Sequence, residues 1–348
     1  MTIKKSLTIT MPDDWHVHLR SGELLAKVVG DTAKNFCRAI VMPNLVKPVI
    51  KTSDAVQYRQ TITSVLEPGS NFTPLMTCYL TDETSPDDLA DGFKQGVFSA
   101  AKLYPAGATT NSDSGVTNIS RLDSVFSTMS EAGIPLLVHG EVVDSKVDVF
   151  DRERKFIELV LEPLRKRHAR LKIVFEHITT KDAIDYVKTA RPDELAATIT
   201  PHHLSINRSD LFVGGIRPHL YCLPVPKREQ HRLALIEAAC SGDKRFFLGT
   251  DSAPHLVEQK ESECGCAGVY NSPTALQTYL AIFDHHEALD KFNNFASLNG
   301  PEFYNLKQNT NEILFEKHSL PINIEDRQVG ASRVKTFAPP FPLFWRTS

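Results

Sequence analysis

The chain has 348 residues, of which 41% are hydrophobic and 23% are charged, and its 39 Lys and Arg face 42 Asp and Glu. So large an apolar fraction excludes a disordered protein, and the near-neutral balance argues against nucleic acid or an anionic membrane as the main partner. No apolar stretch reaches the roughly 18 residues that cross a bilayer, and the first residues lack the apolar core of a signal peptide. Six cysteines are too few for a disulfide scaffold, so we expect a cytoplasmic protein.

Eight short apolar runs, each followed by a polar residue and a helical pattern, recur along the chain. They are Leu7–Thr10 with Asp14–His18, Arg38–Met42, Thr73–Tyr79, Phe98–Leu103, Ile134–His139, Leu171–His177, Leu195–Thr200 and Arg245–Thr250. Strands that alternate with helices predict parallel β-α units, and eight units fit a closed α/β barrel of the (β/α)8 TIM type better than an open sheet.

Helical signals lie between these runs. Ser85-Pro86 with two following aspartates predicts a capped helix start, and apolar residues at helical spacing over 119–129 stop at Gly133. After Asn299 the pattern decays. We therefore expect a single domain over residues 1–348, with the barrel at about 7–305 and a C-terminal extension at about 306–348 packed on its outside.

A barrel carries its chemistry at the C-terminal ends of its strands, and polar residues end these runs. They are His16, His18, Asn44, Lys102, His139, His177 and Asp251. His16 and His18 are two apart in a strand, so their side chains share one face and can converge on one cation. Four histidines and one aspartate suit zinc or a similar first-row ion.

Lys102 allows two interpretations. In the simpler one, its stem packs in the strand while its amine meets a nearby acid. In the other, desolvation beside cations would lower its pKa toward a neutral amine. Such an amine can take up carbon dioxide and become a carbamate, which is in effect a long carboxylate able to bridge two metals.

Several blocks of the sequence closely resemble the dihydroorotases, and more narrowly their compact bacterial type within the amidohydrolase superfamily. The blocks are Asp14–Arg20, Met42–Asn44, Lys102–Pro105, Val138–Glu141, Phe175–Thr180, Gly249–His255 and Cys264–Gly268, with Lys260-Glu261 between the last two. They occur in order over roughly residues 12–305, while the last forty or so residues match nothing that can be placed.

The resemblance implies a binuclear metal site. Its ligands would be His16, His18, Lys102, His139, His177 and Asp251. The more buried metal would take the first two histidines and the aspartate, and the other metal the last two histidines. Lys102, as N6-carboxylysine, would bridge two zinc ions together with a hydroxide. In the reversible hydrolysis of L-dihydroorotate to N-carbamoyl-L-aspartate, in pyrimidine synthesis, this hydroxide would attack the ring amide and Asp251 would shuttle the proton.

The resemblance also implies how the small-molecule substrate is held. Arg20, Asn44 and His255 would clamp its carboxylate, and the main chain at Leu223 and Ala267 would meet the ring. Simpler interpretations remain for the clamp: a surface salt bridge for Arg20, a turn position after proline for Asn44, and a solvated loop histidine for His255.

The segment Pro105–Gly115 has no periodicity and carries glycine near both ends, so we expect a mobile lid whose Thr109 and Thr110 reach the substrate. An ordinary exposed turn is the alternative.

Cys264 and Cys266 suggest a thiolate metal site with Cys222, although we favour a loop of buried, reduced thiols. His202-His203 are expected at most to line the pocket, and His285-His286 to be exposed.

Two other functions stay open at this point. A hydantoinase or allantoinase would share the histidines, the lysine and the aspartate, although the carboxylate clamp favours a dihydroorotase. A catalytically inactive barrel acting as a structural partner should have lost ligands, and this chain keeps all six. A homodimer is implied by the resemblance alone.

Overall fold

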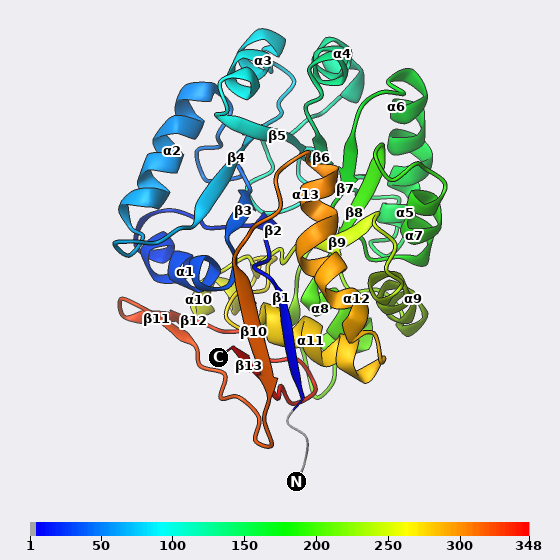
Figure 1. Cartoon of the computed structure of the whole chain (residues 1–348). Coiled ribbons are helices and arrows are strands. Elements are labelled where there is room, and N and C mark those ends of the chain that lie inside the picture. Colours follow the sequence, from blue (N-terminus) through cyan, green and yellow to red (C-terminus); the bar gives the residue numbers. More distant parts are fainter. Residues whose placement is uncertain (1–4, 348) are drawn as a thin grey trace.

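The computed structural model describes residues 5–347, and its centre is a parallel sheet whose eight strands pair in the order of the chain (Figure 1). The strands are β2 (Asp14–Val17), β3 (Arg38–Val41), β4 (Thr73–Tyr79), β5 (Phe98–Leu103), β6 (Leu136–Val138), β7 (Ile173–Phe175), β8 (Leu195–Ile199) and β9 (Phe246–Leu248). A parallel bridge between Val17 and Ser252 joins the chain after β9 back to β2 and closes the barrel. The predicted (β/α)8 fold is confirmed.

Helices surround the strands, and their ends follow from local sequence chemistry. They are α1 (Gly22–Asn35), α2 (Thr52–Ser64), α3 (Pro86–Lys94), α4 (Asp123–Ala132), α5 (Arg152–Phe156), α6 (Glu162–Arg167), α7 (Lys181–Lys188), α8 (Pro201–Ser205), α9 (Glu229–Cys240), α10 (Val257–Lys260), α11 (Ala275–His285), α12 (Leu289–Asn293) and α13 (Asn299–Phe303). Ser85 caps α3 by accepting a hydrogen bond from the Asp88 amide at 3.3 Å, as predicted. Gly133 ends α4 with a left-handed φ of 71°.

The barrel has two apolar layers, one between its strands and helices and one inside it. The inner layer consists of Trp15, Ile40, Met42, Ala100, Leu137, Val174, Ala196, Phe247, Phe303 and Tyr304. Trp15 stacks on Tyr304 with ring centres 4.5 Å apart. Gly300 permits this contact, because a Cβ there would lie 1.9 Å from the indole nitrogen of Trp15. Side chains thus fill the barrel and leave room for chemistry only at its mouth.

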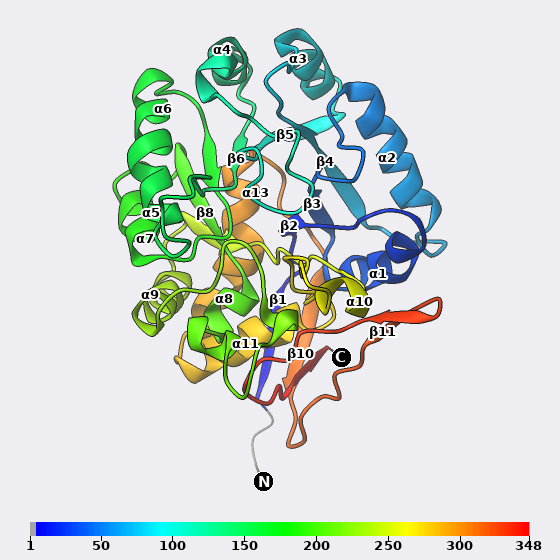
Figure 2. The same ribbon diagram turned by 180° about the vertical axis from the view of Figure 1, so that it is seen from behind.

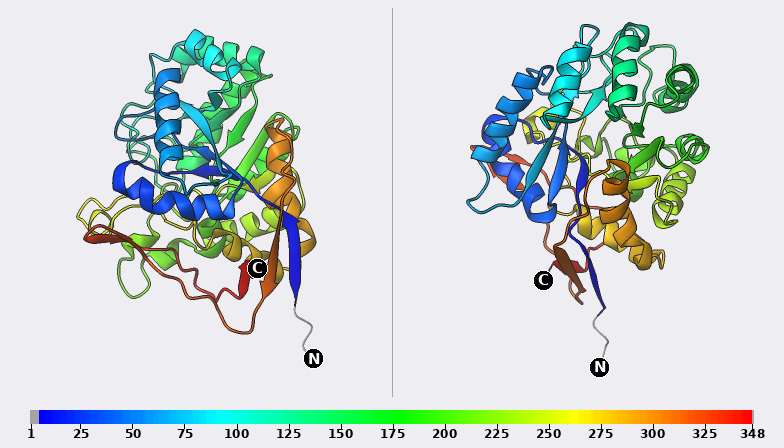
Figure 3. Two further views of the ribbon diagram at one scale, coloured as in Figure 1. Left: turned by 60° about the vertical axis from the view of Figure 1, so that its left-hand side comes forward. Right: turned by 45° about the horizontal axis from the view of Figure 1, so that its top comes forward.

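The N-terminal strand differs from the prediction. β1 (Ser6–Thr10) lies outside the barrel and pairs antiparallel with β10 (Glu312–Lys317), which also pairs with β13 (Trp345–Thr347) (Figure 3). The expected first run, Leu7 to His18, is therefore two strands with different partners. The two strands have different partners because their burial differs. Buried and exposed side chains alternate along β1, which suits a sheet with one face in solvent, whereas β2 is buried throughout.

The C-terminal segment also reaches the loops at the barrel mouth. β11 (Arg327–Val329) and β12 (Ser332–Val334) form a hairpin, seen beside α10 in Figure 2. Isolated bridges join Val334 to Leu256 and Thr336 to Tyr270, on either side of the loop after β9. None of the described helices is long and apolar enough to cross a membrane.

Candidate metal centre

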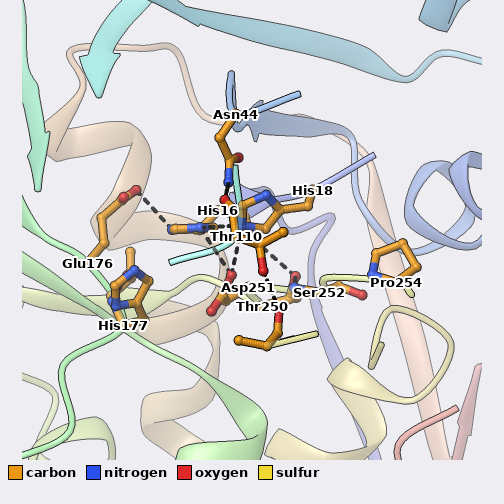
Figure 4. A network of polar contacts seen from close by, with 12 residues as sticks. His16, His18, Asn44, Thr110, Glu176, His177, Thr250, Asp251, Ser252 and Pro254 are labelled. Atoms are coloured by element: carbon orange, nitrogen blue, oxygen red, sulfur yellow. Dashed lines mark hydrogen bonds and ion pairs between the residues drawn. The ribbon is translucent and has the colours of Figure 1, made fainter. Parts of the chain in front are cut away.

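Each predicted ligand lies at the C-terminal end of a barrel strand or within three residues after one. His16 belongs to β2 and Lys102 to β5, while His139, His177 and Asp251 follow β6, β7 and β9. His177 and Asp251 have left-handed φ angles of 41° and 45°. This conformation is costly for residues other than glycine and is concentrated at functional sites. In Figure 4 the side chains of His16, His18, His177 and Asp251 lie close together.

Three of the donors form a compact triangle. The Nε2 atoms of His16 and His18 are 3.3 Å apart, and they lie 3.2 and 3.1 Å from Oδ1 of Asp251. Ligands bound about 2.0–2.2 Å from a tetrahedral zinc ion are about 3.4 Å from one another. The triangle therefore has the dimensions of one face of a coordination shell, and these residues fit a divalent cation.

The other histidines adjoin this triangle. The ring centre of His177 lies 5.0 Å from that of His16 and 4.8 Å from that of His139. Nδ1 of His177 is buried and has no hydrogen-bond partner among residues 5–347. A buried ring nitrogen without a partner is unusual in a folded protein, and it also fits a cation at this position.

Burial sets the protonation of these donors. It lowers the pKa of His18 to about 3, and it lowers the pKa of His16, His139 and His177 below the ordinary value. Burial alone would raise the pKa of Asp251, but the imidazoles of His16 and His18 hold it well below its usual range. Neutral imidazoles beside an ionised carboxylate are the protonation states that metal binding requires.

Lys102 is completely buried at the centre of this group. Its ammonium donates to Oε2 of Glu176 and lies 4.9 Å from the centre of the Tyr104 ring. Burial lowers the pKa of this ammonium well below its ordinary value. In the unmodified chain the amine thus meets an acid, as in the simpler interpretation, while its environment also favours the neutral, nucleophilic form.

The proposed substrate clamp is brought together beside the metal ligands. Nη2 of Arg20 lies 2.9 Å from Nε2 of His255, and Nε of Arg20 donates to the Pro254 carbonyl at 3.1 Å. The guanidinium therefore faces the site, which disfavours the surface salt bridge. Asn44 donates from Nδ2 to the Thr110 carbonyl at 2.9 Å.

One small cavity connects these groups. Its lining includes all the predicted site residues except Lys102 and His255: His16, His18, Arg20, Asn44, Thr109, Thr110, His139, His177, Leu223, Asp251 and Ala267. Thr110 closes it by donating from Oγ1 to the Ala267 carbonyl at 3.3 Å. The cavity holds about 20 Å³, which is room for about one water molecule. The segment 105–115 therefore covers the site in this conformation.

The remaining histidines and cysteines lie outside this donor group, although donor atoms of His202, His203 and Cys222 lie within 4.8 Å of one another. His203 donates from Nε2 to the Pro224 carbonyl at 2.9 Å, and Asn271 donates to Nδ1 of His202 at 3.1 Å. His285 and His286 are exposed, as expected. The cysteine loop was expected to be buried, but Cys264 is exposed, because the side chain of Lys260 occupies the inside of the loop and binds its carbonyls.

Four buried charged residues beside the site were given no role by reasoning from the sequence. They are Asp14, Glu141, Glu176 and Lys260. Asp14 accepts hydrogen bonds from the amide and hydroxyl of Thr250 at 2.8 and 2.6 Å, and burial raises the pKa of its carboxyl to about 7. Lys260 donates to three carbonyls beside the cavity. The available signal for Asp14, Glu141 and Glu176 was a charge within two residues of a predicted ligand, and for Lys260 it was its place in a resembling block.

Comparison with known proteins agrees with this geometry. The sequence profile of the amidohydrolase family matches residues 9–314. A dihydroorotase of Erythrobacter litoralis is 55% identical over 344 residues, which cover 98% of this chain and 99% of that protein.

Solved structures agree as well. The crystal structure of dihydroorotase in complex with 5-fluoroorotic acid from Saccharomyces cerevisiae has a TM-score of 0.91 at 30% identity, covering 99% of this chain and 98% of that one. An L-hydantoinase of Arthrobacter aurescens has a TM-score of 0.78 at 13% identity, covering 97% and 87%, and so shares the fold alone. The chain therefore belongs to the amidohydrolase family, and within it to the dihydroorotases.

Proposed function

We propose that this chain catalyses the reversible, metal-dependent hydrolysis of the cyclic amide of L-dihydroorotate to N-carbamoyl-L-aspartate, the third step of pyrimidine synthesis. The observation that carries the proposal is the meeting of two different groups in one cavity. A set of imidazole and carboxylate donors lies beside the cationic side chain of Arg20. The first group suits hydrolysis of an amide, and the second suits a substrate with a free carboxylate.

The proposal includes two zinc ions per chain, which suit imidazole and carboxylate donors. One would be held by His16, His18 and Asp251, and the other by His139 and His177. When bound, the ions would acidify the attacking water and polarise the amide carbonyl. His16 adjoins both positions: its donor atoms lie within 4.8 Å of those of His18 and Asp251, and also of those of Glu176 and His177.

Lys102 would join the two halves of the site as a carbamate. Its neutral amine nitrogen forms a bond to the carbon of carbon dioxide and loses one proton, leaving N6-carboxylysine. The new negative charge would replace the ammonium that now faces Glu176. Two anions so close would repel each other in a buried site, so this modification should go together with cation binding.

Asp251 would move the proton. As water attacks the ring carbonyl, the ionised carboxylate accepts the proton that the water loses, and it then delivers this proton to the leaving ring nitrogen as the C–N bond breaks. Arg20, Asn44 and His255 would meanwhile hold the substrate carboxylate, with the main chain of Leu223 and Ala267 against the ring.

The direct test measures the hydrolysis of dihydroorotate, hydantoin and allantoin by one preparation whose metal content is also determined. Turnover of dihydroorotate well above that of the other two is expected. Preference for hydantoin or allantoin would instead make the chain a different cyclic amidohydrolase. Absence of turnover in a fully metallated sample would support an inactive barrel.

The ligand assignment makes its own prediction. His16→Ala and His177→Ala should each lower both the metal content and the turnover, because each removes one imidazole donor. The exposed His286 offers a matched control, since His286→Ala should change neither. Full metal content and normal turnover in either of the first two variants would show that the assignment is wrong.

The segment 105–115 must move if the proposed substrate is to enter. The closed cavity of about 20 Å³ is far too small for a six-membered ring with a carboxylate. The contacts that hold the segment shut include polar ones, from Thr110 to the Ala267 carbonyl and from Asn111 to the Asn44 carbonyl at 3.1 Å. Such contacts suit a lid that opens and closes, and closure would exclude water during the reaction.

The double variant Thr109→Ala with Thr110→Ala tests this lid. Its turnover should fall at least about tenfold, or roughly 1.4 kcal/mol of transition-state stabilisation, because two hydroxyls near the substrate are lost. Metal content should stay at the wild-type level, since neither threonine is a proposed ligand. Unchanged kinetics would indicate that the segment is an ordinary exposed turn.

The homodimer and the cytoplasmic location stay predictions.

A further inference from the structure

We infer that Glu141 is a positioning residue that fixes the imidazole of His139 so that its Nδ1 atom faces the metal centre. The inference rests on the proposed function, because it takes His139 as a metal ligand. Oε2 of Glu141 lies 3.1 Å from Nε2 of His139, and both side chains are completely buried or nearly so.

The chemistry of the two groups determines where the proton lies. A carboxylate only accepts hydrogen bonds, and a neutral imidazole has one N–H group. The short contact therefore places the N–H of His139 on Nε2 and leaves the lone pair on Nδ1. His139 lines the cavity with the other donors, and with Nε2 turned to Glu141 its Nδ1 lone pair would face a cation bound there. Carboxylates that orient ligating histidines in this way strengthen metal binding.

The backbone is built to make this contact. The amide of Glu141 donates to the carbonyl of His139 at 3.2 Å, which closes a tight turn directly after β6. Gly140 lies in this turn against Phe175, and a Cβ at position 140 would lie 1.9 Å from an atom of that ring. The close approach holds the turn in place, with the side chains at 139 and 141 next to each other.

A purely structural role accounts poorly for Glu141. Burying a carboxylate is costly unless it receives several hydrogen bonds. Glu153, which is equally buried, accepts them from the amides and hydroxyls of both Thr179 and Thr180. Oε1 of Glu141, in contrast, has no hydrogen-bond partner among the described residues, and its other oxygen faces a predicted ligand.

Competition with a chromophoric zinc chelator measures this role without using activity. Glu141→Ala should weaken the binding of at least one zinc ion by about 10–100-fold, the usual effect of losing such a partner. Glu141→Gln should lose less, because its amide oxygen can still accept from Nε2. Glu153→Gln is the matched control: it removes a buried charge that touches no proposed ligand, and zinc affinity should be unchanged. Wild-type affinity in both Glu141 variants would overturn the inference.

A second measurement separates this inference from the proposed function. In the metal-free protein with ¹⁵N-labelled histidine, NMR should show His139 with its proton on Nε2, and Glu141→Ala should shift this tautomer balance more than Glu141→Gln does. The signal can be assigned with His139→Gln. A proton on Nδ1 in the wild type would refute the role of Glu141. Failure of the wild type to bind two ions or to hydrolyse dihydroorotate would instead contradict the proposed function.

Discussion

Lys102→Ala is expected to lose most of the turnover, because it removes the group that would bridge the two halves of the site. Adding a short carboxylic acid such as acetate or propionate should then restore part of the activity. The deletion leaves space at the centre of the buried donor group, and a free carboxylate can fill it and supply the missing negative charge. The measurement is the initial rate of dihydroorotate hydrolysis at increasing acid concentration, with metal content determined in parallel.

The opposite rescue would contradict this account. If alkyl amines restored activity and carboxylic acids did not, the functional form of Lys102 would be its ammonium, paired with Glu176 as in the unmodified chain. Lys172 offers a control within the barrel, since its ammonium donates to the Phe303 carbonyl at 2.6 Å, away from the donor group. Neither acids nor amines should change the activity of Lys172→Ala.

The sequence predicted the barrel because its signal is repeated eight times. Each strand of a parallel barrel is buried on both faces, so it forms a short apolar run that a polar residue ends. β1 was assigned wrongly because it lies only three residues before β2 and is also apolar in part. Its partner, β10, lies about 300 residues further along the chain, and strand pairing at such a distance leaves no local mark.

The candidate site was predictable to the extent that its residues end strands. His16, His18, Lys102, His139, His177 and Asp251 could be proposed as one group because strand ends meet at one face of a barrel. Roles for Glu141 and Glu176 could not be predicted in this way, because these roles depend on which ring nitrogen or ammonium each carboxylate faces. Those contacts, at 3.1 Å from Glu141 to His139 and from Glu176 to His16, exist only in three dimensions.

Asp251→Asn is expected to cut turnover by about 10²–10⁴ while leaving the affinity for dihydroorotate roughly intact, the usual result of removing a general acid-base group. The substitution is well matched to the position. Asparagine keeps a side-chain oxygen that can contact the cation, and it tolerates the left-handed φ of 45° that residue 251 adopts.

What asparagine lacks is a carboxylate that can accept a proton. In the wild type, His16 and His18 hold the pKa of Asp251 well below its ordinary value, so this group enters the reaction ionised. Turnover and the Michaelis constant should be measured at saturating zinc, so that a weaker metal ligand is not mistaken for a lost base. A change confined to the Michaelis constant would indicate that Asp251 only binds the substrate. Recovery of full turnover with added zinc would indicate that it is a metal ligand alone. A low turnover that persists in the fully metallated variant is the result that a proton shuttle requires.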